Sequence, residues 1–388
     1  MEIAVQSGKA LHGNTSNSDY LRALGYQDVS IEVNDQCNFH CVYCPYDSDK
    51  SHQFAVMDQR MVKEIIDRLA VDHALDGYLL FNVLGEPLMY SGLFDLIKYA
   101  NSSGLKTKLI TNGSLLTKKN IDALIDASPT LLKISVESLD PEVFAELRGT
   151  TISFNTYINR ISNLISSSIK AGGGFTSYIQ MDLIYANGKL HALKRVCGLE
   201  ANDPGREGLY ETKTQLLKDV KVFLGQLIES DVISEASVGD LAPDDAAYLE
   251  NHVPYIRIAP NIAFHIKPYL RWDDIFARKY PVANDGRGCH VANLGIHASG
   301  DVVLCCLDYN ASTILGNVFH QSLPDILTTP RSLKIIQDLR QGVYFFDACK
   351  SCQGHSTLIG KYVIGARRQK TIIRVHRAVL AAKRKKVS

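Results

Sequence analysis

The chain has 388 residues, of which 46% are hydrophobic, and its 42 Lys and Arg against 41 Asp and Glu give a formal net charge of +1. This apolar content suffices for one large domain and one small appended domain. No apolar run reaches eighteen residues and no charged-then-apolar signal segment opens the sequence, which argues against a membrane span and against secretion. We therefore expect a cytoplasmic protein whose cysteines are reduced.

From about residue 28, short runs rich in Val, Ile, Leu and Phe alternate with amphipathic stretches. The amphipathic stretches at 57–71, 93–102 and 118–126 predict helices. Six strands are expected, the first near residue 28 and the others at 78–84, 109–113, 132–138, 178–185 and 262–267. Such alternation is typical of parallel strands buried on both faces, with crossover helices outside them. It predicts an α/β fold, a partial (β/α)6 TIM-like barrel that binds ligands at the carboxyl ends of its strands.

Cys37, Cys41 and Cys44 lie in the run Gln-Cys-Asn-Phe-His-Cys-Val-Tyr-Cys-Pro. Soft thiolates suit an iron–sulfur cluster, and C-x3-C-x2-C spacing can bind three of four irons and leave the fourth open to a cofactor. Structural zinc normally needs a fourth protein ligand, which is missing locally. Disulfides are disfavoured in a reducing compartment. The spacing therefore favours a metal cluster.

Further signals follow at the ends of the expected strands and helices. They are Gly85-Glu86-Pro87, Thr111-Asn112-Gly113, Ser135, Glu137 and the pair Arg148-Gly149. Each alone is an ordinary turn or element-end residue, because glycine tolerates unusual backbone angles and proline stops a helix. Parallel strands end at one edge, so we expect these residues to converge with the cysteine loop.

The order of these motifs resembles that of the radical S-adenosylmethionine (SAM) enzymes, with Tyr43 as the aromatic residue before the third cysteine. The resemblance implies a 4Fe-4S cluster on the three cysteines, with SAM on the open iron. It further implies reductive cleavage of SAM to a 5′-deoxyadenosyl radical that abstracts hydrogen from a C–H bond. The SAM contacts that it implies are Tyr43 at the adenine, Gly85, Glu86 and Pro87 at the amino group, Asn112, Ser135 at the ribose or carboxylate, Arg148 at the carboxylate, and Gln180.

A second cysteine set consists of Cys289, Cys305 and the C-x2-C pair Cys349 and Cys352. Four thiolates can complete either a zinc site or an iron–sulfur cluster, and the spacing does not choose between them. The pattern resembles the twitch domain, the shortened form of the SPASM extension of radical SAM enzymes. This resemblance implies a small α+β domain that holds an auxiliary 4Fe-4S cluster on these four cysteines.

Cys306 adjoins one of these proposed ligands. Neighbouring residues of a strand point to opposite faces, so we expect only one of Cys305 and Cys306 to reach the cluster. The Gly300-x4-Cys305 register of the hairpin favours Cys305. In the same resemblance, residues 315–318 and a helix near 331–341 connect the hairpin to the last cysteine pair.

The resemblance implies that the auxiliary cluster can accept an electron from a substrate radical while a base accepts a proton, which completes a two-electron oxidation. The candidate bases are Glu137, Asp182, His265, Lys267 and Asp308. Cys197 is either a small buried side chain or a thiol that donates a hydrogen atom to the radical. The second role would make the enzyme an epimerase.

Three other regions carry weaker signals. A long insertion, about 186–258 with a helix near 211–230, is expected to form a substrate lid or a specificity element. The segment 264–272 either lines a pocket or forms a barrel strand and a surface loop. Residues 361–388 hold ten Lys or Arg and no acid. They predict a basic amphipathic helix that packs on the barrel or contacts a phosphorylated substrate, an anionic membrane surface or nucleic acid.

We divide the chain into an N-terminal extension (1–27), a radical SAM partial barrel (28–285), a twitch-like domain (286–360) and a basic helix (361–388). The leading hypothesis is a dehydrogenase-like oxidoreductase of a sugar, cyclitol or related small molecule, similar to the twitch dehydrogenases of aminocyclitols. A flavodoxin- or ferredoxin-type protein would supply electrons. A peptide ranks second as a substrate hypothesis, because peptide-modifying relatives often carry a leader-binding module before the barrel and we expect none here. The alternative of another class is a non-catalytic iron–sulfur or zinc protein.

Overall fold

The computed structural model describes residues 20–45, 54–71, 75–185, 213–234, 255–268, 289 and 292–353. The strands are β1 (Asp28–Ile31), β2 (Leu79–Leu80), β3 (Thr107–Thr111), β4 (Leu131–Glu137), β5 (Tyr178–Tyr185), β6 (Tyr255–Ala259), β7 (Ile262–Pro268), β8 (Asn293–Ile296), β9 (Asp301–Val303) and β10 (Ile314–Asn317). The α-helices are α1 (Tyr20–Ala23), α2 (Gln59–Val71), α3 (Leu93–Ser102), α4 (Lys118–Ala127), α5 (Pro141–Arg148), α6 (Phe154–Ala171), α8 (Lys213–Glu229), α12 (Leu323–Leu327), α13 (Pro330–Arg340) and α14 (Asp347–Gln353). Short 3-10 turns cover Pro87–Met89 and Gly172–Gly174.

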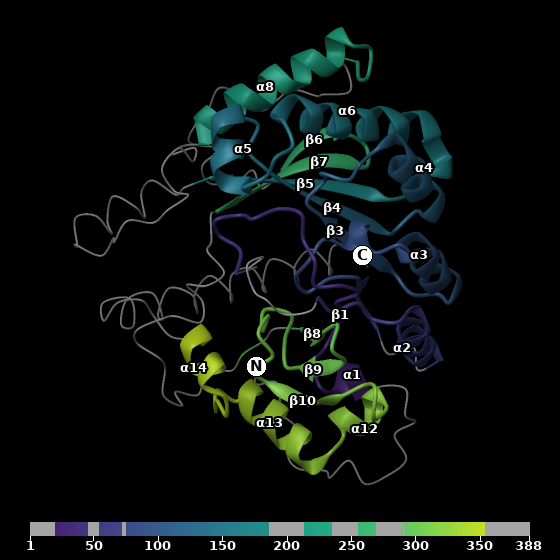
Figure 1. Ribbon diagram of the computed structural model, residues 1–388, viewed down its shortest axis with the longest axis vertical. Helices are drawn as coiled ribbons and strands as arrows, with labels where there is room; N and C mark the ends of the chain where they lie inside the picture. Colours follow the sequence, from purple (N-terminus) through teal and green to yellow (C-terminus); the bar gives the residue numbers. More distant parts are fainter. Residues whose placement is uncertain are drawn as a thin grey trace, which may run out of the picture.

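All ten strands join one sheet in the order β10-β9-β8-β1-β2-β3-β4-β5-β7-β6. From β8 through β1 to β5 and β7 every neighbouring pair is parallel, and β6, β9 and β10 add antiparallel edges. The two end strands do not pair with each other, so the sheet is an unclosed barrel, as the sequence predicted. The strands β8–β10 of the second cysteine region extend the same sheet (Figure 1).

One face of the sheet is fully buried and the other is not. Helices α2, α3, α4 and α6 cover the outer face (Figure 1). On β4, Leu132, Ile134 and Val136 point to this covered face and are fully buried, whereas Lys133 and Ser135 between them are only half-buried. The expectation of strands buried on both faces is therefore confirmed for β1, β2 and β8, where consecutive residues are buried, and wrong for β4, where half-buried polar side chains alternate with apolar ones.

Local signals set the helix that carries Arg148. The Asp140 side chain accepts hydrogen bonds from the first backbone N–H groups of α5, and Pro141 occupies the first helical position. Such a cap satisfies donors that have no partner within the helix. The helix ends at Gly149, whose φ of +51° is left-handed and favours glycine.

Several predicted boundaries agree with the structure. The predicted strand at 178–185 matches β5 and the predicted helix at 93–102 matches α3, while the helices at 57–71, 118–126 and 211–230 shift by one or two residues. The predicted strand at 78–84 is too long, because only Leu79–Leu80 pair in β2. The last residues of the predicted insertion form a strand that was not expected, β6, which pairs antiparallel with β7.

The segment before β1 belongs to the core. Tyr20, Leu21 and Tyr26 are buried, and the Tyr26 hydroxyl donates to the Leu304 carbonyl at 3.1 Å. The Arg340 guanidinium of α13 lies 5.3 Å from the centre of the Tyr26 ring. The segment before β1 therefore packs against the second cysteine region. Among the described helices, none has the length and apolar character that a membrane crossing requires.

Candidate functional site

The first glycine turn lies directly against the cysteine loop that follows β1. Gly85 has φ +74°, and a Cβ there would lie 2.4 Å from the Asn34 carbonyl oxygen. The next residue, Glu86, donates its backbone N–H to the Gln36 carbonyl at 2.6 Å. Only glycine allows this angle and this approach, so the turn fixes the chain just before Cys37.

A second glycine holds the loop from the opposite side. Gly149 has φ +51°, and a Cβ there would lie 2.4 Å from the His40 carbonyl oxygen. The His40 N–H donates to the Arg148 and Gly149 carbonyls, each at 3.2 Å, and the Val42 N–H donates to Leu147 at 3.1 Å. The end of α5 is thus bonded to the middle of the cysteine loop, between Cys37 and Cys44.

The Glu86 side chain links the end of β2 to the end of β3. Its carboxylate accepts hydrogen bonds from Leu88 N at 3.0 Å, Thr111 Oγ1 at 2.7 Å and Asn112 N at 2.7 Å. Burial raises its pKa above the usual value, although these donors oppose that effect. The carboxylate therefore orders two strand ends, and the contact of this turn's backbone with the amino group of SAM stays a prediction.

Asn112 connects the cysteine loop to the interior. Its Nδ2 lies 3.8 Å from Cys37 Sγ and donates to Asn38 Oδ1 at 3.0 Å. Its carbonyl accepts from Tyr157 Oη at 3.0 Å and from Arg148 Nη2 at 3.5 Å. The amide that the Thr-Asn-Gly motif places at the end of β3 therefore contacts the proposed cluster loop.

Arg148 is a buried guanidinium, 1% exposed, at the centre of this edge. It donates to the Tyr43 hydroxyl, lies 3.6 Å from Glu137 Oε1 and stacks 4.8 Å from the centre of the Phe39 ring. Within the described part of the chain, its Nε is buried and has no hydrogen-bond partner. A guanidinium with spare donor capacity suits a carboxylate, so this edge fits the amino-acid part of SAM.

Glu137 ends β4 in an unusual backbone conformation. Its φ is +69°, which a non-glycine residue rarely adopts, and the pairing with β5 shifts register between Ser135 and Glu137. Burial raises the pKa of its carboxyl above the usual value, and the Arg148 charge opposes this effect. Strain of this kind gathers at functional sites, and here it aims a carboxylate at Arg148.

The half-buried inner face of the sheet brings together other predicted residues. The Asp182 carboxylate lies 2.9 Å from Lys133 Nζ and 2.5 Å from Lys267 Nζ, and accepts from Gln180 Nε2 at 2.7 Å. His265 Nε2 lies 3.1 Å from the Tyr178 hydroxyl, and burial lowers its pKa. Ser135 lies on the same face of β4. The predicted Gln180, Asp182, His265 and Lys267 therefore converge with it on the inner face of the sheet.

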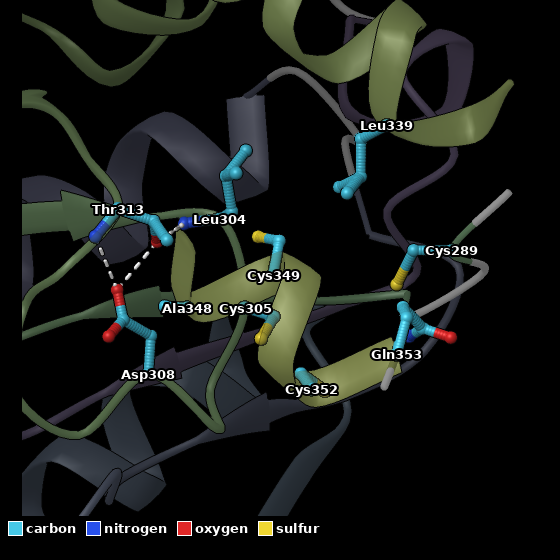
Figure 2. Close-up of a pocket in the computed structure, with 10 residues that line it drawn as sticks. All are labelled: Cys289, Leu304, Cys305, Asp308, Thr313, Leu339, Ala348, Cys349, Cys352 and Gln353. Carbon is cyan, nitrogen blue, oxygen red and sulfur yellow. Dashed lines mark hydrogen bonds between the residues drawn. The ribbon is translucent and has the colours of Figure 1, made fainter. Parts of the chain in front are cut away.

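Four cysteines of the second set line one pocket (Figure 2). Cys289, Cys305, Cys349 and Cys352 surround it, and Leu304, Leu339 and Ala348 supply apolar walls. Burial raises the pKa of Cys349 to about 12 and raises that of Cys305. A buried thiolate without a cation is costly, and metal binding would offset that cost. The donor set therefore fits a metal centre.

No three His, Cys, Asp or Glu side chains among the described residues are close enough to share one ion. An iron–sulfur cluster does not require such closeness, because its thiolates bind different irons. The first loop and the second pocket each supply soft ligands from free cysteines. Both sites therefore fit the group that their residue types predict.

Cys305 lines the pocket, whereas Cys306 is not among the residues that line it. The argument from strand alternation was nevertheless wrong, because β9 ends at Val303 and both cysteines follow it in a turn. Gly300 does lie in the turn of the β8–β9 hairpin, with φ +85°. The conformation of this turn, and not the alternation of a strand, determines that Cys305 and not Cys306 lines the pocket.

Asp308 lies in this pocket, but its carboxylate is fully engaged (Figure 2). One oxygen accepts from Ser312 N at 2.9 Å, and the other accepts from Thr313 N at 2.7 Å and Thr313 Oγ1 at 2.6 Å. These bonds shape the turn at 308–313. A role as a base would require Asp308 to exchange them, so that role stays a prediction.

Sequence reasoning missed a buried pair that joins the two sites. The Glu32 carboxylate accepts from Leu84 N at 2.9 Å and from Ala298 N at 3.1 Å. His297 Nδ1 lies 3.5 Å from the same carboxylate, and His297 Nε2 lies 2.7 Å from the Asp308 carbonyl. A glutamate directly after the first strand, next to Ile31 and Val33, was the available signal. Cys197, residues 269–272 and the tail 361–388 lie outside the described residues.

Two family models match the chain. The radical SAM superfamily model matches residues 31–183, and the model of the SPASM iron–sulfur cluster-binding domain matches residues 289–353. The chain thus contains a radical SAM domain followed by a C-terminal SPASM domain. The first domain implies SAM and a 4Fe-4S cluster, and the second implies auxiliary iron–sulfur clusters.

The chain is also similar to proteins of known name. One is a GTP 3′,8-cyclase of Staphylococcus haemolyticus, 31% identical over 36% of this chain and 42% of the relative. Another is an AdoMet-dependent heme synthase of Methanosarcina barkeri, 29% identical over 32% of this chain and 35% of the relative. The matches thus span less than half of these curated relatives. Among solved structures, BtrN in complex with AdoMet and 2-DOIA has 16% identity and a TM-score of 0.46, over 86% of this chain and 95% of that one.

Proposed function

We propose that this protein is a radical SAM oxidoreductase that removes hydrogen from a C–H bond of a sugar, a cyclitol or a related polar small molecule. The observation that carries the proposal is the contact of the cysteine loop with Gly85 and Gly149, which sets Cys37 beside Asn112. A simple electron carrier has no use for a loop with an open iron position beside a buried guanidinium. We therefore favour catalysis over a non-catalytic iron–sulfur or zinc protein.

In this proposal Cys37, Cys41 and Cys44 hold the first cluster, which together with SAM supplies a 5′-deoxyadenosyl radical after one-electron reduction. The Arg148 guanidinium binds the carboxylate of the methionine part, and Tyr43, held by that guanidinium, borders the adenine. The backbone at Gly85, Glu86 and Pro87 receives the amino group. Asn112, Ser135 and Gln180 complete the predicted SAM contacts.

The second cluster, on Cys289, Cys305, Cys349 and Cys352, would accept an electron from the substrate radical. A base must accept the proton that accompanies this oxidation. Glu137 supports this part of the proposal better than Asp308, because it ends β4 beside Arg148. The oxygens of Asp308 are already committed to the turn at 308–313.

We place this activity in the cytoplasm, with a flavodoxin- or ferredoxin-type protein as the electron donor. No two of the eight described cysteines form a disulfide with each other, in keeping with a reducing compartment. The names of the relatives, a GTP cyclase and a heme synthase, show that this kind of domain occurs in proteins that act on small molecules. These names support a small-molecule substrate, and a peptide stays the second hypothesis.

The deciding experiment is anaerobic. The protein is reconstituted with iron and sulfide, its iron per chain is counted, and it is reduced with dithionite in the presence of SAM. We expect about eight irons, as for two four-iron clusters, and formation of 5′-deoxyadenosine. Cys37→Ala should abolish 5′-deoxyadenosine, whereas Cys349→Ala should lower the iron content and leave SAM cleavage. Zinc at the second site, or SAM binding without cleavage by the reduced protein, would overturn the proposal.

A further inference from the structure

The half-buried inner face of the sheet carries a cluster of lysines. Lys108 of β3, Lys133 of β4 and Lys267 of β7 lie around Asp182 of β5. Asp182 is 5% exposed and contacts two ammonium groups, while the Lys133 and Lys267 side chains remain 20% and 37% exposed. The carboxylate is thus enclosed, and the two ammonium groups border accessible space.

Two ammonium groups of the cluster, those of Lys133 and Lys267, contact a single carboxylate, that of Asp182. Burial lowers the pKa of Lys267 to about 8, and the charge of Lys133 adds to this effect against the opposing pull of Asp182. Burial and Lys133 likewise lower the pKa of Lys108, which Asp28 and Asp182 only partly oppose. Burial is the largest cause of both shifts; burial also acts on Lys133, but there Asp182 and neighbouring groups together outweigh it and the net pKa is raised. An added anion would relieve the repulsion between Lys133 and its neighbours.

The cluster adjoins the proposed SAM edge. Glu137, which lies 3.6 Å from Arg148, also feels the charges of Asp182, Lys133 and Lys267. Lys133 and Glu137 lie on the same strand, four residues apart, with Ser135 between them on the inner face. A small molecule that reaches from Ser135 toward Lys133 would therefore have one end near the SAM site and the other among the lysines.

We propose that Lys133 and Lys267, supported by Lys108, bind an oxyanion of the substrate, a phosphate or a carboxylate, on the inner face of the sheet. This inference rests on the proposed function and narrows its substrate to an anionic small molecule. Asp182 positions both lysines through its contacts with their ammonium groups. One carboxylate cannot neutralise two ammonium groups, so an added anion can bind beside it. Lysine suits this role, because its ammonium group binds phosphate as a compact point charge.

The test measures anion binding and SAM cleavage separately. Pyrophosphate, citrate and neutral myo-inositol are titrated calorimetrically into the full-length reconstituted protein with SAM present. The variants are Lys133→Met and Lys267→Met, each of which leaves Asp182 with one lysine partner. The matched control is Lys118→Met on α4, whose side chain is 89% exposed. Formation of 5′-deoxyadenosine in the same samples reports the proposed function on its own.

We expect pyrophosphate or citrate, and not myo-inositol, to bind, with affinity weakened roughly tenfold or more in either inner-face variant and unchanged in Lys118→Met. Tighter pyrophosphate binding would indicate a phosphorylated substrate, and tighter citrate binding a carboxylate. Two outcomes would overturn this inference and leave the proposed function standing. In one, both inner-face variants still bind the anion as wild type does; in the other, a protein that cleaves SAM binds no anion. Loss of SAM cleavage by wild type would instead overturn the proposed function.

Discussion

The two cysteine sites of this molecule are assembled in different ways. Cys37, Cys41 and Cys44 lie within eight residues of one another, and backbone contacts with Gly85 and Gly149 hold their loop in place. The second set comes from segments far apart in the sequence, which meet around an apolar pocket (Figure 2). The first site therefore depends on close backbone packing, and the second on the docking of distant elements.

This difference separates the perturbations that should damage each site. A Cβ group introduced between the loop and its glycine turns acts on the first site alone. Loss of a contact between the segment before β1 and α13 acts on the second. Both sites share the sheet, since β1 pairs with β8, so a change in the central strands would affect them together.

The largest expected effect is that of Gly149→Ala. The new Cβ would lie 2.4 Å from the His40 carbonyl oxygen, and φ at +51° costs a further ~1–3 kcal/mol for a non-glycine residue. We expect loss of the first cluster, about half of the iron, and loss of SAM cleavage, with the auxiliary cluster retained. Iron counts and electron paramagnetic resonance of the reduced protein measure both.

Gly104→Ala is the matched control for that substitution. Gly104 has a comparable φ of +83°, but no atom lies within 4 Å of the position its Cβ would take. The control therefore shares the backbone strain and lacks the clash. If both variants lose the same amount of iron, the contact with His40 is not what holds the loop.

The next effect is that of Arg148→Met. The substitution leaves Glu137 buried without its guanidinium partner, and removing one member of a buried ion pair typically costs about 3–5 kcal/mol. We expect a lower Tm, weaker SAM binding and the first cluster still present. Arg148→Lys should restore part of the stability and little of the SAM affinity, because an ammonium lacks the planar fork. Equal SAM affinity in wild type and both variants would contradict the role given to Arg148.

The convergence of the first-site motifs could be predicted from the sequence because their determinants are local. A cysteine loop, a Gly-Glu-Pro turn and an Arg-Gly helix end each have a signature within a few residues, and a parallel sheet brings such ends together. The antiparallel edge strand β6 was missed because it lies next to an insertion that hides its start. The second pocket was predicted through resemblance, because the cysteine spacing alone did not distinguish a zinc site from an iron–sulfur cluster.

The inner-face lysines show what local patterns leave out. Lys133 stands in the run Leu131-Leu132-Lys133-Ile134-Ser135, and its alternation with apolar residues was the available signal for a half-buried face. That Lys267 meets the same carboxylate depends on the register of β5 against β4 and β7, which no single segment encodes. The Glu32–His297 pair likewise required the unexpected parallel pairing of β1 with β8.

A smaller effect is expected from Arg340→Met, which tests the docking of the second site. Arg340 Nη1 donates to the Cys289 carbonyl at 2.9 Å, Nη2 donates to the Leu24 carbonyl at 3.3 Å, and the guanidinium stacks on Tyr26. We expect a loss of about 1–3 kcal/mol of stability and a partial loss of auxiliary iron, with SAM cleavage unaffected. Lys334→Met on the same helix, whose side chain is 76% exposed, is the control.

The smallest effect concerns the pair that links the two sites. Burial lowers the pKa of His297, but the adjacent Glu32 carboxylate and the Asp308 carbonyl raise it more, so the net shift is upward. Both ring nitrogens face oxygen acceptors, which favours the protonated ring.

A folded pKa above the unfolded value of about 6.5 gives stability that is full below pH 6.5 and is lost as pH rises through the folded pKa. Wild type should therefore lose stability between slightly acid and mildly alkaline pH, as measured by urea unfolding across that range. His297→Gln should be less stable at low pH and should lack this slope. A slope that survives in His297→Gln would assign the pH dependence to other groups, and Glu32 would then hold Leu84 and Ala298 without help from the imidazolium.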